Sequence, residues 1–159
     1  MPEGTEDRLR NLGYELPAVP RPAGSYVPAT IATGTLLFTA DHLPFKEGRL
    51  AYTGKVGAGV SVEDAKGAAR LCALNALAAV KAEAETLENV RRVVKVVGYV
   101  ASANGFNNQP EVMNGVSDLL DKIFGERGLH ARTAVGVAEL PLDAPVEVEL
   151  TIELSAPQR

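Results

Sequence analysis

Residues 130–154 read His130-Ala-Arg-Thr-Ala-Val-Gly-Val-Ala-Glu-Leu-Pro-Leu-Asp-Ala-Pro-Val-Glu-Val-Glu-Leu-Thr-Ile-Glu-Leu154. Two segments of this stretch, 132–139 and 146–154, alternate in side-chain character and predict β-strands. The second has a continuous apolar face made of Val146, Val148, Leu150, Ile152 and Leu154. Only a short Leu- and Pro-containing connection separates the segments, so we expect a C-terminal hairpin.

Alternation also predicts which side chains share a face of this hairpin. In the first strand Thr133, Val135 and Val137 lie on one face, and Arg132 lies on the other with three small residues, Ala134, Gly136 and Ala138. If the valine faces meet the core, Arg132 and Glu147 both point to the non-core side. Small residues there would allow a subunit or a small ligand to approach closely. The alternative is an ordinary solvated face that carries exposed charges.

The rest of the chain predicts an α+β domain. Ser61 suits an N-cap for a helix over 61–84, and Pro110 suits the first turn of a second helix that reaches about Phe124. Strands are expected at 26–31, 36–40 and 90–101, with a short helix at 5–12 inside a proline-rich, otherwise extended lead-in over 1–23. We therefore predict one domain over 1–159, with a mixed sheet and two main helices on one face.

Composition narrows the functional classes. The chain has 159 residues and a formal net charge of −4, which is unfavourable for binding a phosphate backbone, so we expect no nucleic-acid partner. Its single cysteine, Cys72, lies among apolar residues and predicts a buried small side chain. The polar start and the lack of a long apolar run predict a cytoplasmic protein with no membrane partner.

Several of these stretches together resemble the YjgF/RidA family. The signature is carried by Ala131-Arg132-Thr133, by Leu140-Pro141, and by the strand Val146-Glu147-Val148-Glu149, with 15 residues from the arginine to the first glutamate. Gly24-Ser25-Tyr26, Asn75 and Asn114 match other family positions in order. The resemblance covers roughly residues 24–153.

The resemblance implies a chorismate-mutase-like fold, a homotrimer and ligand clefts between subunits. Well-studied members hydrolyse reactive imines or enamines, such as 2-aminoacrylate, to 2-oxo acids and ammonia. On this basis Arg132 would hold the carboxylate of a small metabolite, a task suited to its bidentate geometry, and Glu147 would position or activate water. Tyr26 would wall the pocket, Asn114 would support it, and Ala134 would contribute mainly backbone. The resemblance implies no metal and no organic cofactor.

The chain departs from the family pattern in several places, including a longer amino-terminal lead-in and a second helix about one turn longer. It has Ala40-Asp41-His42 where many members have Ser-Gly-Gln, and Ala134 where many have a cysteine. Three functions stay open: an imine or enamine hydrolase, a non-catalytic trimer that binds small carboxylates or acts as a regulator or chaperone, and a ribonuclease, which the acidic charge disfavours. Asp41 and His42 could also suggest a metal pair, but a third ligand at useful spacing is missing.

Overall fold

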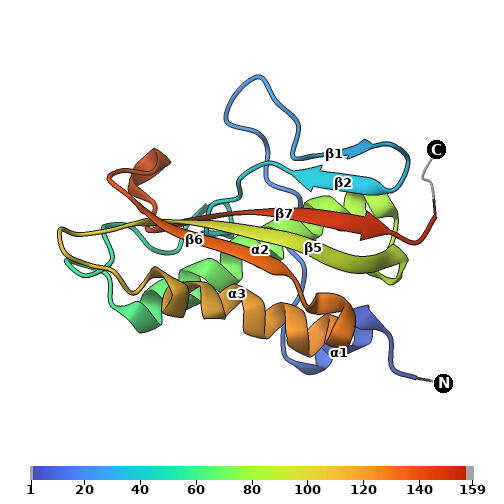
Figure 1. Cartoon of the computed structure of the whole chain (residues 1–159). Helices are drawn as coiled ribbons and strands as arrows, with labels where there is room; N and C mark the ends of the chain where they lie inside the picture. The colour runs from blue at the N-terminus through green and yellow to red at the C-terminus, as the bar shows by residue number, and fades with distance from the viewer. Residues whose placement is uncertain (1, 157–159) are drawn as a thin grey trace.

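The fold is built around a twisted five-stranded sheet, as the computed structural model of residues 2–156 shows (Figure 1). Its strand order is β1-β2-β7-β5-β6, and only the β5–β6 pair is parallel. The strands are β1 Ala29–Ala32, β2 Leu36–Thr39, β5 Val90–Ala101, β6 Ala131–Val137 and β7 Val146–Leu154. The predicted mixed sheet is therefore confirmed. A separate two-stranded hairpin, β3 Phe45–Lys46 with β4 Arg49–Leu50, was not predicted.

Two long helices cover one face of the sheet, as predicted (Figure 1). They are α2 Val62–Ala84 and α3 Gln109–Phe124, and the short α1 Thr5–Asn11 lies near the end of α3. The hydroxyl of Ser61 accepts a hydrogen bond from the Asp64 N–H at 3.1 Å, which confirms the predicted N-cap of α2. Within residues 2–156 the structure also has three 3-10 turns, at Leu87–Asn89, Gly125–Gly128 and Pro141–Asp143.

The core lies between the sheet and these helices, and small residues bring its layers close together. A Cβ at Gly115 of α3 would lie 2.3 Å from the carbonyl oxygen of Lys66 on α2, so the two helix backbones touch at this glycine. Cys72 is buried, and its Sγ donates to the Val146 carbonyl at 3.4 Å, as expected of a packed small side chain. Among the described residues, none of the helices combines the length and apolar character that crossing a bilayer requires.

The prediction of a C-terminal hairpin is wrong. Strands β6 and β7 do not pair with each other; both pair with β5, which lies between them. The connection over 138–145 is long enough to cross the end of β5, where Ala101 donates to the Pro145 carbonyl and Ser102 donates to the Val137 carbonyl. Alternation predicted the strands correctly but does not determine which strands are neighbours.

The expectation that Arg132 and Glu147 share a face is also wrong within one chain. Arg132 is in register with the buried Val96 of β5, so its side chain lies on the helix side of the sheet. Glu147 is in register with Tyr99 and lies on the opposite, outer side. Among the small residues of β6, Ala134 packs against the core, and a Cβ on Gly136 would lie 2.7 Å from Gln109 at the start of α3.

Candidate functional site

Arg132 is held against α3 by three hydrogen bonds. Its Nη1 donates to Asn114 Oδ1 at 2.9 Å and to Ser117 Oγ at 3.1 Å, and its Nη2 donates to the Pro110 carbonyl at 3.2 Å. Arginine has five N–H donors, so two remain without an acceptor among residues 2–156. The guanidinium is thus fixed in orientation and still has two donors for an anion, which is the condition for bidentate carboxylate binding.

The supporting acceptors are themselves bonded. Asn114 donates from Nδ2 to Glu111 at 3.0 Å, and Glu111 accepts from Lys66 at 2.9 Å, so the chain of contacts reaches α2. Since Asn114 and Ser117 are three residues apart on α3, they project from the same side of the helix. A hollow of about 350 Å³ lies beside Arg132, and its lining includes Ser117 and His130.

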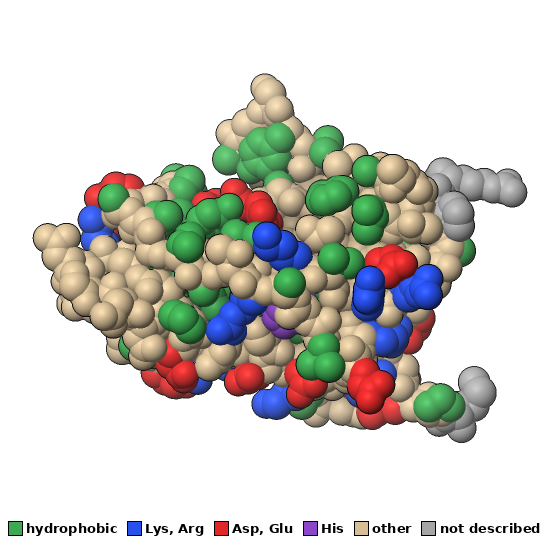
Figure 2. All heavy atoms as spheres, in the orientation of Figure 1, with side chains coloured by type: hydrophobic (Ala, Val, Ile, Leu, Met, Phe, Trp, Pro, Cys, Tyr) green, Lys and Arg blue, Asp and Glu red, His purple; other side chains and the backbone are tan. Residues whose placement is uncertain are grey.

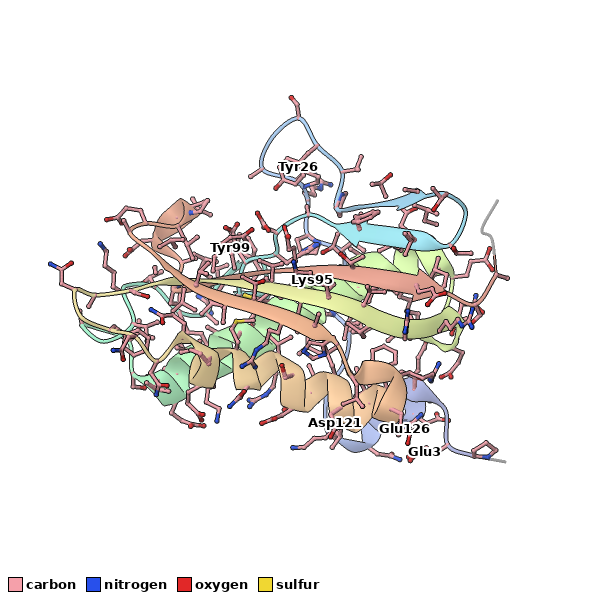
Figure 3. The ribbon with its side chains drawn as sticks, viewed as in Figure 1. Glu3, Tyr26, Lys95, Tyr99, Asp121 and Glu126 are labelled. Carbon is pink, nitrogen blue, oxygen red and sulfur yellow. The ribbon has the colours of Figure 1, made fainter. Side chains whose placement is uncertain are left out.

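A second, larger pocket lies on the outer face of the sheet. It measures about 850 Å³ and is formed by the loop before β1, the start of the segment after β2, and β7. The polar side chains that line it include Tyr26, Asp41, His42, Glu147 and Glu149. Figure 2 shows acidic side chains at the base of the notch beside the projecting loop, and Figure 3 shows Tyr26 on that loop.

Burial and neighbouring carboxylates raise the pKa values of several side chains in this outer pocket. Burial, together with the nearby charges of Asp41 and Glu149, raises the pKa of Glu147 to about 7. Burial also raises the pKa of Glu149, and a hydrogen bond with Asp41 adds to the increase while Lys95 opposes it. Burial and the same carboxylates raise the pKa of Tyr99. Glu147 can therefore accept or donate a proton near neutral pH.

The structure brings the predicted site residues together in two groups. Arg132 and Asn114 are in direct contact on the helix side, and Ala134 lies two residues further along the same face of β6, packed against the core. Tyr26 and Glu147 line the outer pocket. Within one chain the two groups lie on opposite sides of the sheet, so the expected convergence of Arg132, Glu147 and Tyr26 is not found there.

Sequence reasoning missed Ser117 and assigned no role to His130. Helical spacing from Asn114 would have pointed to Ser117, and the two-residue spacing from His130 to Arg132 would have placed both side chains on one face. Glu149 and Tyr99 were also not singled out. Asp41, which comes from a distant part of the chain, contributes to the raised pKa of both side chains.

Asp41 and His42 border the outer pocket, but their roles differ. His42 is buried, bridges to Val148, and donates from Nε2 to the Pro28 carbonyl at 3.3 Å, so it fastens the loop to the sheet. Burial lowers its pKa, which favours the neutral ring. Over residues 2–156, no three His, Cys, Asp or Glu side chains are grouped in a way that could hold a metal ion.

Residues 6–154 match the family model described as "YjgF/chorismate mutase-like, putative endoribonuclease". The match spans most of the chain, and the chain therefore belongs to the YjgF family, as the sequence resemblance indicated.

Three relatives show how far this similarity extends. Protein TCP17 of Trypanosoma cruzi is 42% identical over 148 residues, which are 92% of each chain. The crystal structure of Atu1372 from Agrobacterium tumefaciens, a protein of unknown function, has 45% identity and a TM-score of 0.88, with 96% of this chain and 92% of that chain covered. A Shewanella oneidensis protein described as a putative endoribonuclease has 34% identity and a TM-score of 0.92, with 95% and 99% covered.

Proposed function

We propose that the protein hydrolyses small, reactive imines or enamines that carry a carboxylate, giving a 2-oxo acid and ammonia. The observation that carries the proposal is Arg132, fixed by three acceptors with two N–H groups still available. A carboxylate of the 2-aminoacrylate type would accept both of these hydrogen bonds. Anchoring it would hold the reactive carbon in one position, and positioning of this kind lowers the barrier to water attack.

Glu147 would supply the proton transfers. With a pKa of about 7, its carboxyl group is protonated in part of the molecules at neutral pH. The acid form would give a proton to the methylene carbon of the enamine, which produces an iminium ion. The resulting carboxylate would take a proton from water as the water oxygen adds to the iminium carbon. Ammonia would then leave with that proton, while the hydroxyl proton of the intermediate returns to Glu147, which forms the carbonyl of the 2-oxo acid and restores the acid form.

This assignment requires a second copy of the chain. Arg132 and Glu147 lie on opposite faces of one sheet, so one protomer alone does not present both to a single substrate. We propose a homotrimer in which the Arg132 side of one subunit meets the outer pocket of its neighbour. Strand β6 suits such a contact because it is an edge strand, with β5 on one side and no strand on the other among the described residues.

The separation of Arg132 and Glu147 on opposite faces of the sheet also favours a second function, the binding of small carboxylates without catalysis. A trimer that only binds small carboxylates would need Arg132 and would not need Glu147 beside it. One solved structure of this fold, Escherichia coli TdcF, has serine bound; it is 23% identical to this chain, with a TM-score of 0.58. In a binding protein the outer carboxylates would be a separate feature of the surface.

Ammonia release distinguishes these two functions. Imines are generated in the cuvette by an amino-acid oxidase or lyase, and the rate of ammonia formation is compared with and without the protein. A hydrolase accelerates ammonia release above the spontaneous rate, whereas a binding protein leaves the rate unchanged or slows it. Titration calorimetry with a 2-oxo acid gives a binding signal for both. No acceleration over a set of short-chain imines would contradict the proposed hydrolase.

A ribonuclease function has less support from the molecule. The net charge is −4, and nucleic-acid binding depends on clustered cations. We expect no measurable binding of single-stranded RNA at physiological salt by fluorescence anisotropy. Sub-micromolar affinity would contradict this expectation.

A further inference from the structure

Ser117 and His130 form a hydrogen-bonded pair. In the proposed imine hydrolysis Ser117 only holds Arg132 in position, and His130 has no part. Ser117 Oγ lies 2.9 Å from His130 Nε2, and His130 Nδ1 lies 2.6 Å from the Gly128 carbonyl oxygen. Ser117 is on α3 and His130 directly precedes β6, so a helix and a strand position the pair. Both side chains are half-buried and line the hollow of about 350 Å³, so they are accessible to a small molecule.

The Gly128 carbonyl determines which ring nitrogen of His130 carries the proton. A carbonyl oxygen only accepts hydrogen bonds, so Nδ1 of His130 must carry the ring proton and donate it to Gly128. In the neutral ring Nε2 is then an acceptor, and the hydroxyl of Ser117 donates to it. The histidine is thus oriented as a base for the serine proton. A nucleophile, a base, and a third group that orients the base are the three parts of an activated serine.

Arg132 acts on the same oxygen. Its Nη1 donates to Ser117 Oγ at 3.1 Å, so a fixed positive charge lies beside the atom that would lose a proton. A nearby cation favours the negatively charged form of an oxygen. The two remaining N–H groups of Arg132 are also available to an oxygen that becomes negative during the reaction.

We propose that Ser117 is a nucleophile with His130 as its general base, in a second activity: acyl transfer from small esters or thioesters to water. Ser117 Oγ forms a bond to the acyl carbon as its proton moves to His130 Nε2. The alcohol or thiol leaves with that proton, and an acyl group remains on Ser117. Water then adds to the acyl carbon and gives a proton to His130. The bond to Ser117 breaks as His130 returns this proton to Ser117 Oγ, which releases the carboxylic acid and regenerates the free serine and the neutral histidine.

The surroundings limit the acyl group. The hollow is small, and its lining includes Asp118 and Asp121, both exposed carboxylates, as Figure 3 shows for Asp121 on the flank of α3. Negative charge at the rim disfavours an anionic acyl group. A short, uncharged acyl group is therefore the substrate class that fits.

The test uses 4-nitrophenyl acetate with the whole protein. We expect a burst of nitrophenol that matches the protein concentration, and one acetyl group on the peptide that contains Ser117, found by mass spectrometry. Ser117→Ala should abolish both signals, and His130→Gln should slow acylation about 100-fold. The matched control is Ser155→Ala, at an exposed serine after β7, which should behave as wild type.

Each result decides the proposal. Acetylation of Ser117 that depends on His130 supports it. The absence of a burst, or acetyl groups on lysines alone, overturns it. Ser117→Ala can also weaken carboxylate binding, because Ser117 helps to hold Arg132, but such a loss does not count as support for acyl transfer. Thermal melts of each variant confirm folding; alanine is well tolerated within a helix such as α3. The proposal does not depend on imine hydrolysis, because acetylation is detected directly on the serine.

Discussion

The two faces of the sheet place their charged groups in different environments. On the helix side Arg132 donates hydrogen bonds to three neutral acceptors, so its position is fixed and it keeps its positive charge. On the outer side Asp41, Glu147 and Glu149 crowd one another, and their proximity changes proton affinity. Under the proposed function, the arginine side would orient an anion and the outer carboxylates would exchange protons. Neither alone has all the parts that imine hydrolysis needs, and a second copy of the chain could combine them.

The largest effect is expected at Arg132. Arg132→Ala should reduce imine hydrolysis about 1000-fold, since it removes the fixed donors for substrate charge. Arg132→Lys should fail similarly, because an ammonium cannot reproduce the bidentate geometry. Ammonia release and calorimetry with a 2-oxo acid measure both losses, and Arg10→Ala, at an exposed arginine on α1, is the control. Unchanged affinity in Arg132→Ala would disprove its role as carboxylate anchor.

Glu147→Gln should affect turnover more than binding. The amide keeps the shape but cannot exchange a proton, so we expect kcat to fall about 100-fold while the affinity for a 2-oxo acid changes little. Steady-state kinetics and calorimetry separate the two quantities. Equal losses in both would indicate that Glu147 contacts the ligand as a binding group.

Mixed trimers test whether the two faces combine between subunits. Arg132→Ala and Glu147→Gln proteins, each inactive alone, are mixed after mild denaturation and refolded together. In a cyclic trimer with one arginine and one glutamate from different subunits at each site, about a quarter of the sites regain both groups. Activity should therefore rise about 25-fold above Glu147→Gln alone and about 250-fold above Arg132→Ala alone. Light scattering that shows a monomer at micromolar concentration would rule out this arrangement.

Gly115→Ala tests the packing that supports the arginine side. The added Cβ would lie 2.3 Å from the Lys66 carbonyl oxygen, so α3 must move away from α2. Overpacking of this kind costs about 1–3 kcal/mol of unfolding free energy, which urea denaturation would measure. The control is Gly59→Ala, where the added carbon meets nothing within 4 Å. Equal stability of both variants would show that the helices separate without cost.

The smallest expected effect is the pH dependence of stability. Because the pKa of Glu147 is raised from 4.5 to about 7, the folded protein binds more protons than the unfolded chain between these values. The unfolding free energy should therefore decrease as pH rises from 5 to 8. The group is about half buried, so water reduces the size of the effect. Urea titrations at several pH values should show a weaker decrease in Glu147→Gln, and an identical slope would contradict the assignment.

Local patterns predicted the elements well and their arrangement less well. The N-cap at Ser61, the valine-rich strand over 90–101 and the helix that begins near Pro110 all follow from short-range preferences, and all are present. The pairing of β6 and β7 was mispredicted because it depends on β5, which is about 30 residues earlier in the sequence than β6. No local rule includes such a partner.

The face of Arg132 could not be predicted for a related reason. Valines normally mark the buried face of a strand, but Val135 is 41% exposed. On β6 the helix side has Ala134, which packs against the core, and Gly136, where a Cβ would lie 2.7 Å from Gln109 at the start of α3. The carboxylate cluster likewise joins Asp41 to β7 through a contact that the sequence does not reveal.

The position of β7 also determines the order in which the sheet can be completed. It is the middle strand, between β2 and β5, yet it is the last of the five to leave the ribosome. Its register joins Leu37 to Ile152, a contact between distant parts of the sequence that must close a very long loop. The β1–β2 hairpin can therefore join the sheet only after β7 has been synthesised. Folding should proceed at the slow rate typical of long-range strand pairing.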